Sequence, residues 1–192
     1  FFVPPATVST VAKEAWLIPR FERLFSQREQ IITKVVDTAT GQMVAFMNWA
    51  APFCLTDAER EERKRAEEVE KAKYGTAEEA RAARFAAGTN LDCAEEIFSA
   101  FGAMREKWYK ENEHYDPAYQ KKGLGTLLLN QALGRADREG KQAYLESMEA
   151  GHPLYLKLGW VDVELFEVDV RKWGGDRKAP YWVMIRNPRS LN

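Results

Sequence analysis

The sequence predicts an α/β or α+β fold in which helices flank a mixed β-sheet. Helical and β-prone segments alternate along the chain, and two pairs of β-prone segments are joined by glycine-containing turns. A third observation is an apolar stripe at helical spacing over residues 90–108. Because 192 residues fit one domain, we expect a single domain over residues 1–192 with a polar helical insertion at about 56–88.

The composition is that of an ordinary globular protein, with 45% hydrophobic and 30% charged residues. The formal net charge of −1 gives no electrostatic reason to bind nucleic acid or an anionic membrane. No signal peptide and no apolar run long enough to span a bilayer is present, so we expect a cytoplasmic protein. Cys54 and Cys93 are too few for a disulfide framework, and their apolar surroundings favour buried free thiols.

The first third of the chain predicts a helix followed by a hairpin. Residues 6–25 have apolar positions at mostly helical spacing, and Pro19 is expected to divide them into two short helices. Residues 31–36 and 43–49 are β-prone, and the turn between them ends at Gly41, which suits a positive φ.

The segment over residues 56–88 is unusually polar. Thr56 and Glu59 have the spacing of a capping box, and acidic and basic residues then alternate in short blocks up to Gly75. This pattern is typical of a solvated helix with ion pairs four residues apart. A mobile lid over a substrate is the alternative, and the residues do not decide between the two.

Residues 90–108 give the clearest amphipathic helix, and a stripe of this kind forms core rather than a cofactor site. Further along, the sequence predicts a helix over 124–138 ended by Gly140, then a short buried strand at 142–147. A short helix stopped by Gly159 follows, and two β-prone runs joined by a turn at residues 174–176 favour a second hairpin. The stripe of the long helix consists of Ala94, Ile97, Phe98, Phe101, Met104 and Trp108.

A glycine-containing loop precedes the helix at 124–138 and could hold phosphates. The first N–H groups of a helix lack intrahelical partners, and the helix dipole favours negative charge there. Glycines allow a bulky anion to approach these amides, and the lysines add positive charge. A purely structural helix cap is the alternative, because the loop fits neither the Walker pattern nor the dinucleotide pattern. The residues concerned are Gln120, Lys121, Lys122, Gly123, Leu124, Gly125 and Thr126.

The segments DPAYQKKGLGTLLLNQAL, AYLES and PLYLKLGW together resemble the GCN5-related N-acetyltransferase (GNAT) family, particularly its fungal small-molecule-type members. Gln120, Gly123 and Gly125 match the family's Gln/Arg-x-x-Gly-x-Gly/Ala signature. Tyr155 matches its tyrosine ahead of a Gly-aromatic pair, here Gly159-Trp160. The resemblance is dense over residues 116–160, and the first hairpin and the tail YWVMIRNP are also similar to the family.

This resemblance implies a GNAT-like sheet and acetyl-CoA as cosubstrate, with its pyrophosphate on the amides of residues 121–126 flanked by Gln120 and Lys122. It implies direct attack of an amine on the thioester, without an acyl-enzyme. The sequence contains no metal-ligand spacing, so we expect no metal. We expect a small-molecule amine as acceptor and a monomer or homodimer. Acetylation of a protein amine and a non-catalytic CoA-binding or regulatory role are the alternatives, since fold alone does not establish function.

Two residues are candidates for proton transfer. The resemblance implies that Tyr155 is the acid that protonates the departing thiolate, for which a phenol with a pKa near ~10 is suited; a core tyrosine is the structural alternative. Glu146 is a candidate base for the ammonium, although an outward structural carboxylate would have the same pattern. Neither His114 nor His152 is assigned a role.

The strand before the loop departs from the family pattern, because residues 110–116 read KENEHYD where an apolar run is expected. We therefore expect this strand to be shortened or missing. A short polar strand over residues 113–116, a segment absent between Tyr115 and Asp116, and a fold without activity are the three explanations. Loss of an interior strand would leave backbone groups unpaired at about 1–3 kcal/mol each. This cost favours the second explanation, with a replacement strand from a partner if the deletion is real.

Overall fold

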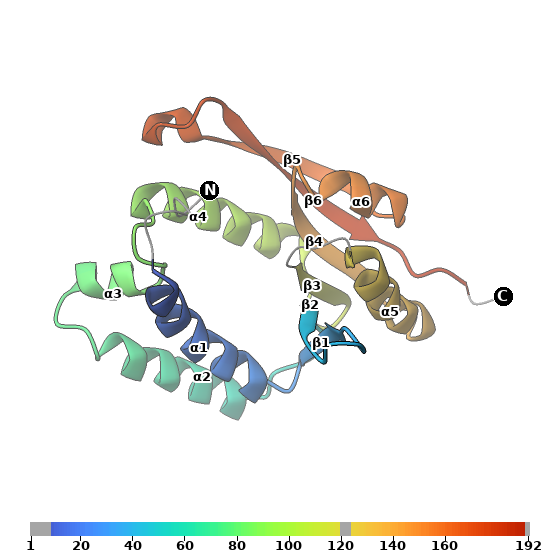
Figure 1. Cartoon of the computed structure of the whole chain (residues 1–192), viewed down its shortest axis with the longest axis horizontal. Helices are drawn as coiled ribbons and strands as arrows, with labels where there is room; N and C mark the ends of the chain where they lie inside the picture. The colour runs from blue at the N-terminus through green and yellow to red at the C-terminus, as the bar shows by residue number, and fades with distance from the viewer. Residues whose placement is uncertain (1–8, 120–123, 191–192) are drawn as a thin grey trace.

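A computed structural model describes residues 9–119 and 124–190 (Figure 1). Within them, six strands form a mixed sheet in the order β1-β2-β3-β4-β6-β5. Only the β3–β4 pair is parallel. The strands are β1 (Gln30–Val36), β2 (Met43–Ala50), β3 (His114–Tyr119), β4 (Gln142–Met148), β5 (Val161–Asp169) and β6 (Lys178–Arg186).

The helices lie on both faces of this sheet, which confirms the expected mixed fold (Figure 1). Helices α5 and α6 cover one face, while α1 and α4 lie on the other (Figure 1). In the described ranges, none of the helices is both long and apolar enough to cross a membrane. Their bounds are α1 (Thr10–Ser26), α2 (Asp57–Lys71), α3 (Ala77–Ala83), α4 (Leu91–Trp108), α5 (Gly125–Arg138) and α6 (His152–Lys157), with the 3-10 helix η1 (Val170–Trp173).

Each face of the sheet has its own apolar core. Alternate residues of β2 and β4 pack against α5, since successive side chains of a strand point to opposite faces. The second core lies under α4 and includes the buried residues Cys93 and Ile97. The first core contains, among others, Met47, Trp49, Leu128, Leu129, Ala143, Leu145, Tyr155 and Trp160.

Helix α1 is one continuous helix, so the expected division at Pro19 is wrong for the described residues. A proline removes a backbone donor from the helix and leaves carbonyls of the preceding turn without one. The Arg20 side chain compensates in part, because its Nη1 donates to the carbonyl oxygen of Trp16 at 2.6 Å. The same guanidinium lies over the Trp16 ring at 4.0 Å, which holds it on this turn.

The first hairpin is confirmed. Strands β1 and β2 pair antiparallel, and Gly41 in the connecting turn has a φ of 70°. The Asp37 carboxylate accepts from the backbone N–H groups of Ala39 and Thr40 at 2.8 and 3.2 Å. The Asp37 side chain therefore accepts hydrogen bonds from N–H groups of the turn, which is the reason that aspartate is favoured at such a position.

The polar segment forms α2 and α3, neither of which contains a buried residue. The capping box at Thr56 is confirmed, with both reciprocal hydrogen bonds to Glu59 present. Arg20 of α1 donates to the carbonyls at the end of α3, and Arg81 of α3 pairs with Asp92 and Glu95 of α4. The segment thus bridges α1 and α4 through charged side chains; a lid function stays a prediction.

An ion pair between Arg63 and the buried carboxylate of Glu29 links α2 to the start of β1, and it leads to a stability prediction. The Glu29 side chain is only 2% exposed, and both its oxygens accept from Arg63 Nη2 at 2.8 and 2.9 Å. We expect Arg63→Ala to lower the free energy of unfolding by about 2 kcal/mol, because it leaves a buried carboxylate without its cation. Urea unfolding measures this change.

The matched control is Glu29→Gln in the Arg63→Ala background. It removes the unpaired charge and should recover part of the lost stability. Equal stability of the double and single variants would show that the buried charge is not the cause.

The long helix α4 is confirmed, with Asn90 as its N-cap, since its side chain accepts from the Cys93 N–H. Ala94 and Ile97 are fully buried, whereas Phe98 is 49% exposed and is not part of the core. The expectation of two buried thiols is correct for Cys93 but wrong for Cys54, which is exposed in the loop after β2. Both cysteines are free thiols.

The C-terminal helices and the second hairpin lie where the sequence predicts them. Gly140 and Gly159, just after α5 and α6, have φ values of 63° and 95°, as expected for residues that end a helix. Strands β5 and β6 pair antiparallel, with η1 inserted before the turn at Gly174. The second hairpin is therefore confirmed, with an extra helical turn at its tip.

The strand before the glycine loop is present but short. Residues 111–113 form a turn after α4 in which the N–H groups of Glu113 and His114 donate to the Lys110 carbonyl. Glu111 and Glu113 therefore lie in an exposed turn and not in the sheet, whereas Asp116 is part of β3. Strand β3 pairs with β2 along four residues, so the short-strand explanation holds with different bounds. An absent segment or a replacement strand is not needed.

Candidate functional site

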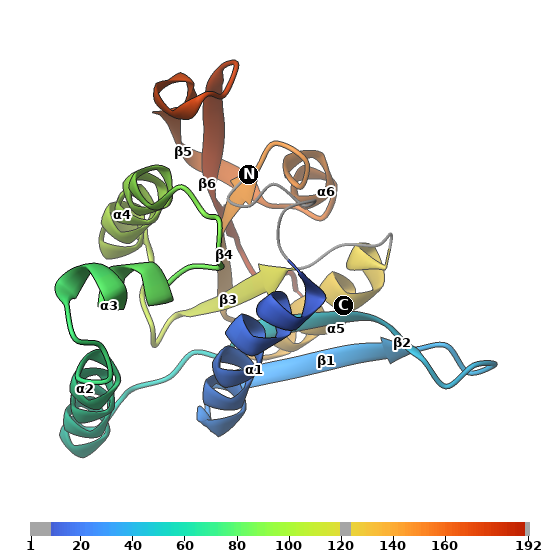
Figure 2. The same ribbon diagram turned by 60° about the vertical axis from the view of Figure 1, so that its left-hand side comes forward.

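An opening in the sheet separates the two parallel strands. Strands β3 and β4 pair only at His114↔Gln142 and Tyr115↔Ala143. Beyond these pairs β3 continues along β2 while β4 continues along β6, and the two strands diverge (Figure 2). Their facing edges then carry backbone N–H and C=O groups that the sheet does not use, and these are available to a ligand.

Helix α5 follows β3 in the chain and begins at Gly125, directly after the glycine loop. Leu124 is its N-cap and has no side-chain capping bond, and the first turn contains no acidic residue. The N–H groups of Gly125, Thr126 and Leu127 thus have no partner within the helix. Gly125 is buried and Thr126 is exposed. This uncapped turn fits an anionic phosphate; Gln120, Lys121, Lys122 and Gly123 lie outside the described residues.

Tyr155 lies on α6 and is buried, with 6% of its surface exposed. Its ring meets Trp160 edge-on, with the ring centroids 5.5 Å apart. A Cβ built on Gly151 would come within 2.9 Å of Tyr155 Cε2, so the backbone at Gly151 lies directly against the ring. The same position is 3.4 Å from Ser147 Oγ of β4. The tyrosine ring therefore packs against the turn that joins β4 to α6.

Glu146 lies in the middle of β4 and is fixed by two neighbours. Arg105 of α4 pairs with it through Nε at 3.0 Å and Nη2 at 3.3 Å. The Tyr144 hydroxyl donates to Glu146 Oε1 at 2.9 Å. The Arg105 guanidinium also lies over the rings of Tyr109 and Tyr144, at 5.2 and 5.7 Å. The carboxylate is 10% exposed and is held as part of this cluster.

The two candidates for proton transfer lie on opposite faces of the sheet. Tyr155 belongs to the core shared by α5 and β4, together with Leu145. Glu146 is the next residue of the strand, points to the other face, and is bound there by α4. Both can reach one reacting group only where the sheet is open, which is the gap between β3 and β4.

His114 is a structural residue. It is 2% exposed; its Nδ1 accepts from the Lys110 N–H at 2.9 Å, and its Nε2 lies 2.9 Å from Gln142 Oε1. Burial lowers the pKa of His114 below its ordinary value. The neutral ring therefore donates through Nε2, and this bond fixes the first β3–β4 pair beside the gap.

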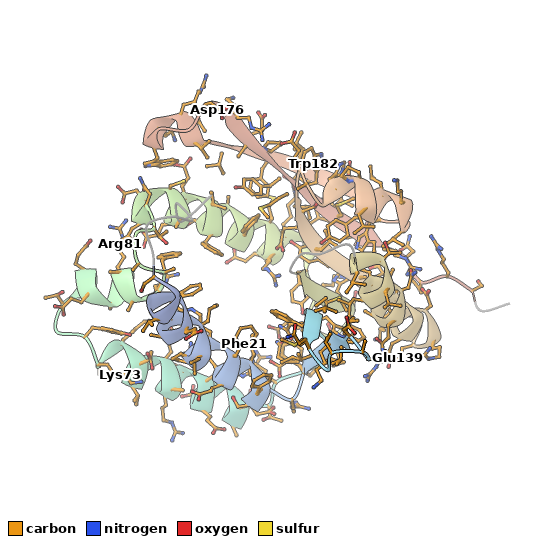
Figure 3. All side chains as sticks on the ribbon, in the orientation of Figure 1. Phe21, Lys73, Arg81, Glu139, Asp176 and Trp182 are labelled. Atoms are coloured by element: carbon orange, nitrogen blue, oxygen red, sulfur yellow. The ribbon has the colours of Figure 1, made fainter. Side chains whose placement is uncertain are left out.

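His152 starts α6, three residues before Tyr155. Its Nε2 lies 2.8 Å from Asp162 Oδ1, and its ring stacks on Trp182 with centroids 4.3 Å apart. Figure 3 labels Trp182 near α6. These contacts fix the first turn of α6, the helix that carries Tyr155. His152 therefore stabilises the position of this helix and does not only form a turn.

A small enclosed space lies in the core and not at the gap. Its volume is about 10 Å³, which is the size needed for one water molecule and too small for a substrate. Among residues 9–119 and 124–190, no group of three or more His, Cys, Asp or Glu side chains could hold a metal ion. The cavity is lined by Trp49, Leu129, Ala132, Leu133, Ala136, Ala143 and Trp160.

Sequence reasoning missed the cluster around Glu146. The spacing of Tyr144 and Glu146 in a strand places both on one face, and this signal was present in the sequence. The partner Arg105 comes from 41 residues away, and no local pattern points to it. The close approach of Gly151 to Tyr155 likewise depends on the fold.

Comparison with protein-family models matches residues 43–160 to the acetyltransferase (GNAT) family. Comparison with curated proteins gave no match. One similar solved structure is a provisionally assigned phosphinothricin N-acetyltransferase, with 15% identity, a TM-score of 0.47, and coverage of 90% of this chain and 78% of that one. An acyl-CoA N-acyltransferase from Pseudomonas aeruginosa has 12% identity and a TM-score of 0.42, with 91% and 84% covered. A GCN5-related N-acetyltransferase from Kribbella flavida has 14% identity and a TM-score of 0.43, with 97% and 81% covered.

Proposed function

The chain belongs to the acetyltransferase (GNAT) family, and from this premise we propose that it transfers the acetyl group of acetyl-CoA directly to the amine of a small molecule. The observation that carries the proposal is the gap between β3 and β4, together with the uncapped N-terminus of α5, the helix that follows β3 in the chain. In this proposal residues 1–192 are one acetyltransferase domain of the fungal small-molecule type, and residues 56–88 are its insertion.

The cosubstrate would bind along the gap and at α5. The N–H groups of Gly125 and Thr126 belong to an uncapped helix start and would suit the pyrophosphate. Gln120, Lys121, Lys122 and Gly123 would complete this site from the loop. The free backbone edges of β3 and β4 would hold the acetyl-bearing arm, and an N–H donor there would stabilise negative charge on the thioester oxygen.

Tyr155 and Glu146 would then move protons on the two sides of the gap. The acceptor nitrogen attacks with its lone pair, so its ammonium must first lose a proton, which Glu146 would take directly or through water. As the new C–N bond forms and the C–S bond breaks, the electron pair stays on sulfur. Tyr155 would donate its hydroxyl proton to that thiolate and recover it from solvent.

Calorimetry with acetyl-CoA and a thiol-release assay over a panel of small amines test the proposal together. We expect one molecule of acetyl-CoA bound per chain and release of CoA thiol that depends on an amine. Binding without turnover on any small amine would indicate a protein amine as acceptor or a CoA-binding protein without catalysis. The absence of binding would contradict the proposed function.

A further inference from the structure

The side-chain amide oxygen of Asn48 on β2 is an unsatisfied hydrogen-bond acceptor among the described residues. This oxygen, Oδ1, is covered from solvent and receives no hydrogen bond from any residue that the structure describes. Buried polar atoms are nearly always paired, because a desolvated acceptor without a donor costs free energy. Asn48 as a whole is only half-buried, so the residue borders accessible space. An outside donor reaches the oxygen once the side-chain amide turns toward that space.

The strand register places Asn48 beside the gap. Its strand neighbours Met47 and Trp49 pack into the core under α5, so Asn48 lies on the opposite face of the sheet. It is paired with Ala118 of β3, three residues beyond the last residue of β3 that pairs with β4, Tyr115. Asn48 thus lies next to the part of β3 that borders the gap.

Glu146 lies across the gap on the same face. It is held there by Arg105 of α4, and α1 covers the neighbouring part of β2, where the Phe21 and Phe46 rings meet edge-on at 5.5 Å (Figure 3). On this face, between α1 and α4, the gap is therefore flanked by an amide oxygen on one side and a carboxylate on the other. Both groups attract N–H donors.

We propose that Asn48 binds the acceptor substrate, with Oδ1 accepting a hydrogen bond from an N–H group of a primary amine. This inference deepens the proposed function and rests on it. In this proposal the amide turns about χ2 so that its oxygen faces the accessible side, a torsion that is soft in asparagine and leaves the backbone in place. A primary ammonium has three N–H donors and the neutral amine keeps two, so the bond persists when the lone pair becomes free to attack.

The test compares two ligands that differ only in their donors, 2-phenylethylamine and its N,N,N-trimethyl derivative. Both are cations, but the second has no N–H group. We expect Asn48→Leu to weaken binding of the primary amine by about tenfold, which is the loss typical of a hydrogen bond to a charged donor. Binding of the trimethyl derivative should not change. NMR titration in the presence of CoA measures both dissociation constants.

Two further variants separate binding from structure. Asn48→Asp keeps an acceptor oxygen and should bind the primary amine at least as well as the wild type. Gln42→Leu removes an exposed amide just before β2 and should change neither dissociation constant. Because Asn48→Leu removes an unpaired buried oxygen, its Tm should not fall.

Three outcomes would overturn the assignment: no binding of the primary amine to the wild type, equal weakening of both ligands, or a lower Tm of Asn48→Leu with unchanged amine binding. Failure of the proposed function has a different result. In that case the primary amine binds through Asn48, but no thiol is released from acetyl-CoA.

Discussion

Tyr155→Phe is expected to lower kcat for acetyl transfer by about 100-fold and to leave the dissociation constant of acetyl-CoA unchanged. Loss of a general acid typically costs a factor of ~10²–10⁴ in rate. The substitution removes only the hydroxyl, and the ring keeps its packing against Trp160 and Gly151. Steady-state thiol release and calorimetry with acetyl-CoA measure the two quantities separately. Unchanged turnover would mean that Tyr155 is a core tyrosine only.

Gly151→Ala tests the same assignment without touching the hydroxyl. The added Cβ would meet Tyr155 Cε2 at 2.9 Å, so the ring must move to make room. We expect kcat to fall by about tenfold, because a displacement of this size disturbs proton transfer. If Tyr155→Phe and Gly151→Ala both lower kcat while the double variant is no worse than Tyr155→Phe, the glycine acts through the tyrosine.

The elements that the sequence predicted correctly are those with short-range causes. Thr56 caps a helix through a hydrogen bond that spans three residues. Gly41, Gly140 and Gly159 adopt positive φ values where the chain must turn. Each of these features depends on a few neighbouring residues, so composition and spacing are enough to reveal it.

The errors come from contacts that the sequence does not encode locally. Pro19 should end a helix, but the Arg20 side chain supplies a donor to the freed turn. Residues 110–116 have poor strand propensity, yet the last three of them join a strand, because β2 and β4 offer backbone partners on both sides. Strand propensity is easily overridden by such pairing. Because β3 pairs with β4 at two positions only, a gap remains between them. The polar sequence of β3 does not predict this gap.

For the candidate site, the sequence predicted positions but not their surroundings. Alternation along residues 142–148 already separates Leu145 from Glu146 by face. It does not show that Arg105 holds the carboxylate, nor that Asn48 lies beside the same gap. Those relations join residues far apart in the chain, and they exist only after the sheet has formed.

The second large effect is expected at the ion pair between α5 and β6. Arg186 is 3% exposed and Asp137 is 11% exposed, and they form two hydrogen bonds of 2.7 and 3.0 Å. The Arg189 N–H also donates to Asp137 at 2.8 Å. We expect Asp137→Ala to lower the free energy of unfolding by about 3 kcal/mol, because it leaves Arg186 buried without a counter-charge. Urea denaturation at pH 7 measures the loss.

The same pair predicts how stability depends on pH. The hydrogen bonds from Arg186, followed by that from the Arg189 N–H, hold the pKa of Asp137 below its ordinary value. The unfolded chain therefore takes up this proton at a higher pH than the folded chain does. The stabilisation is fully present above the unfolded pKa of about 3.9 and is lost as pH falls through the folded value. The difference in stability between the wild type and Asp137→Asn should thus shrink below about pH 4.

A double variant decides whether the charge or the packing matters. Asp137→Leu with Arg186→Met replaces the pair by apolar side chains, and such replacements of buried ion pairs are often neutral or stabilising. We expect the double variant to be more stable than Asp137→Ala. Its free energy of unfolding should also lack the decrease that protonation of Asp137 causes below about pH 4. If Asp137→Ala is as stable as the wild type, the pair contributes nothing. If the double variant is as unstable as Asp137→Ala, the defect lies in packing between α5 and β6 and not in an uncompensated charge.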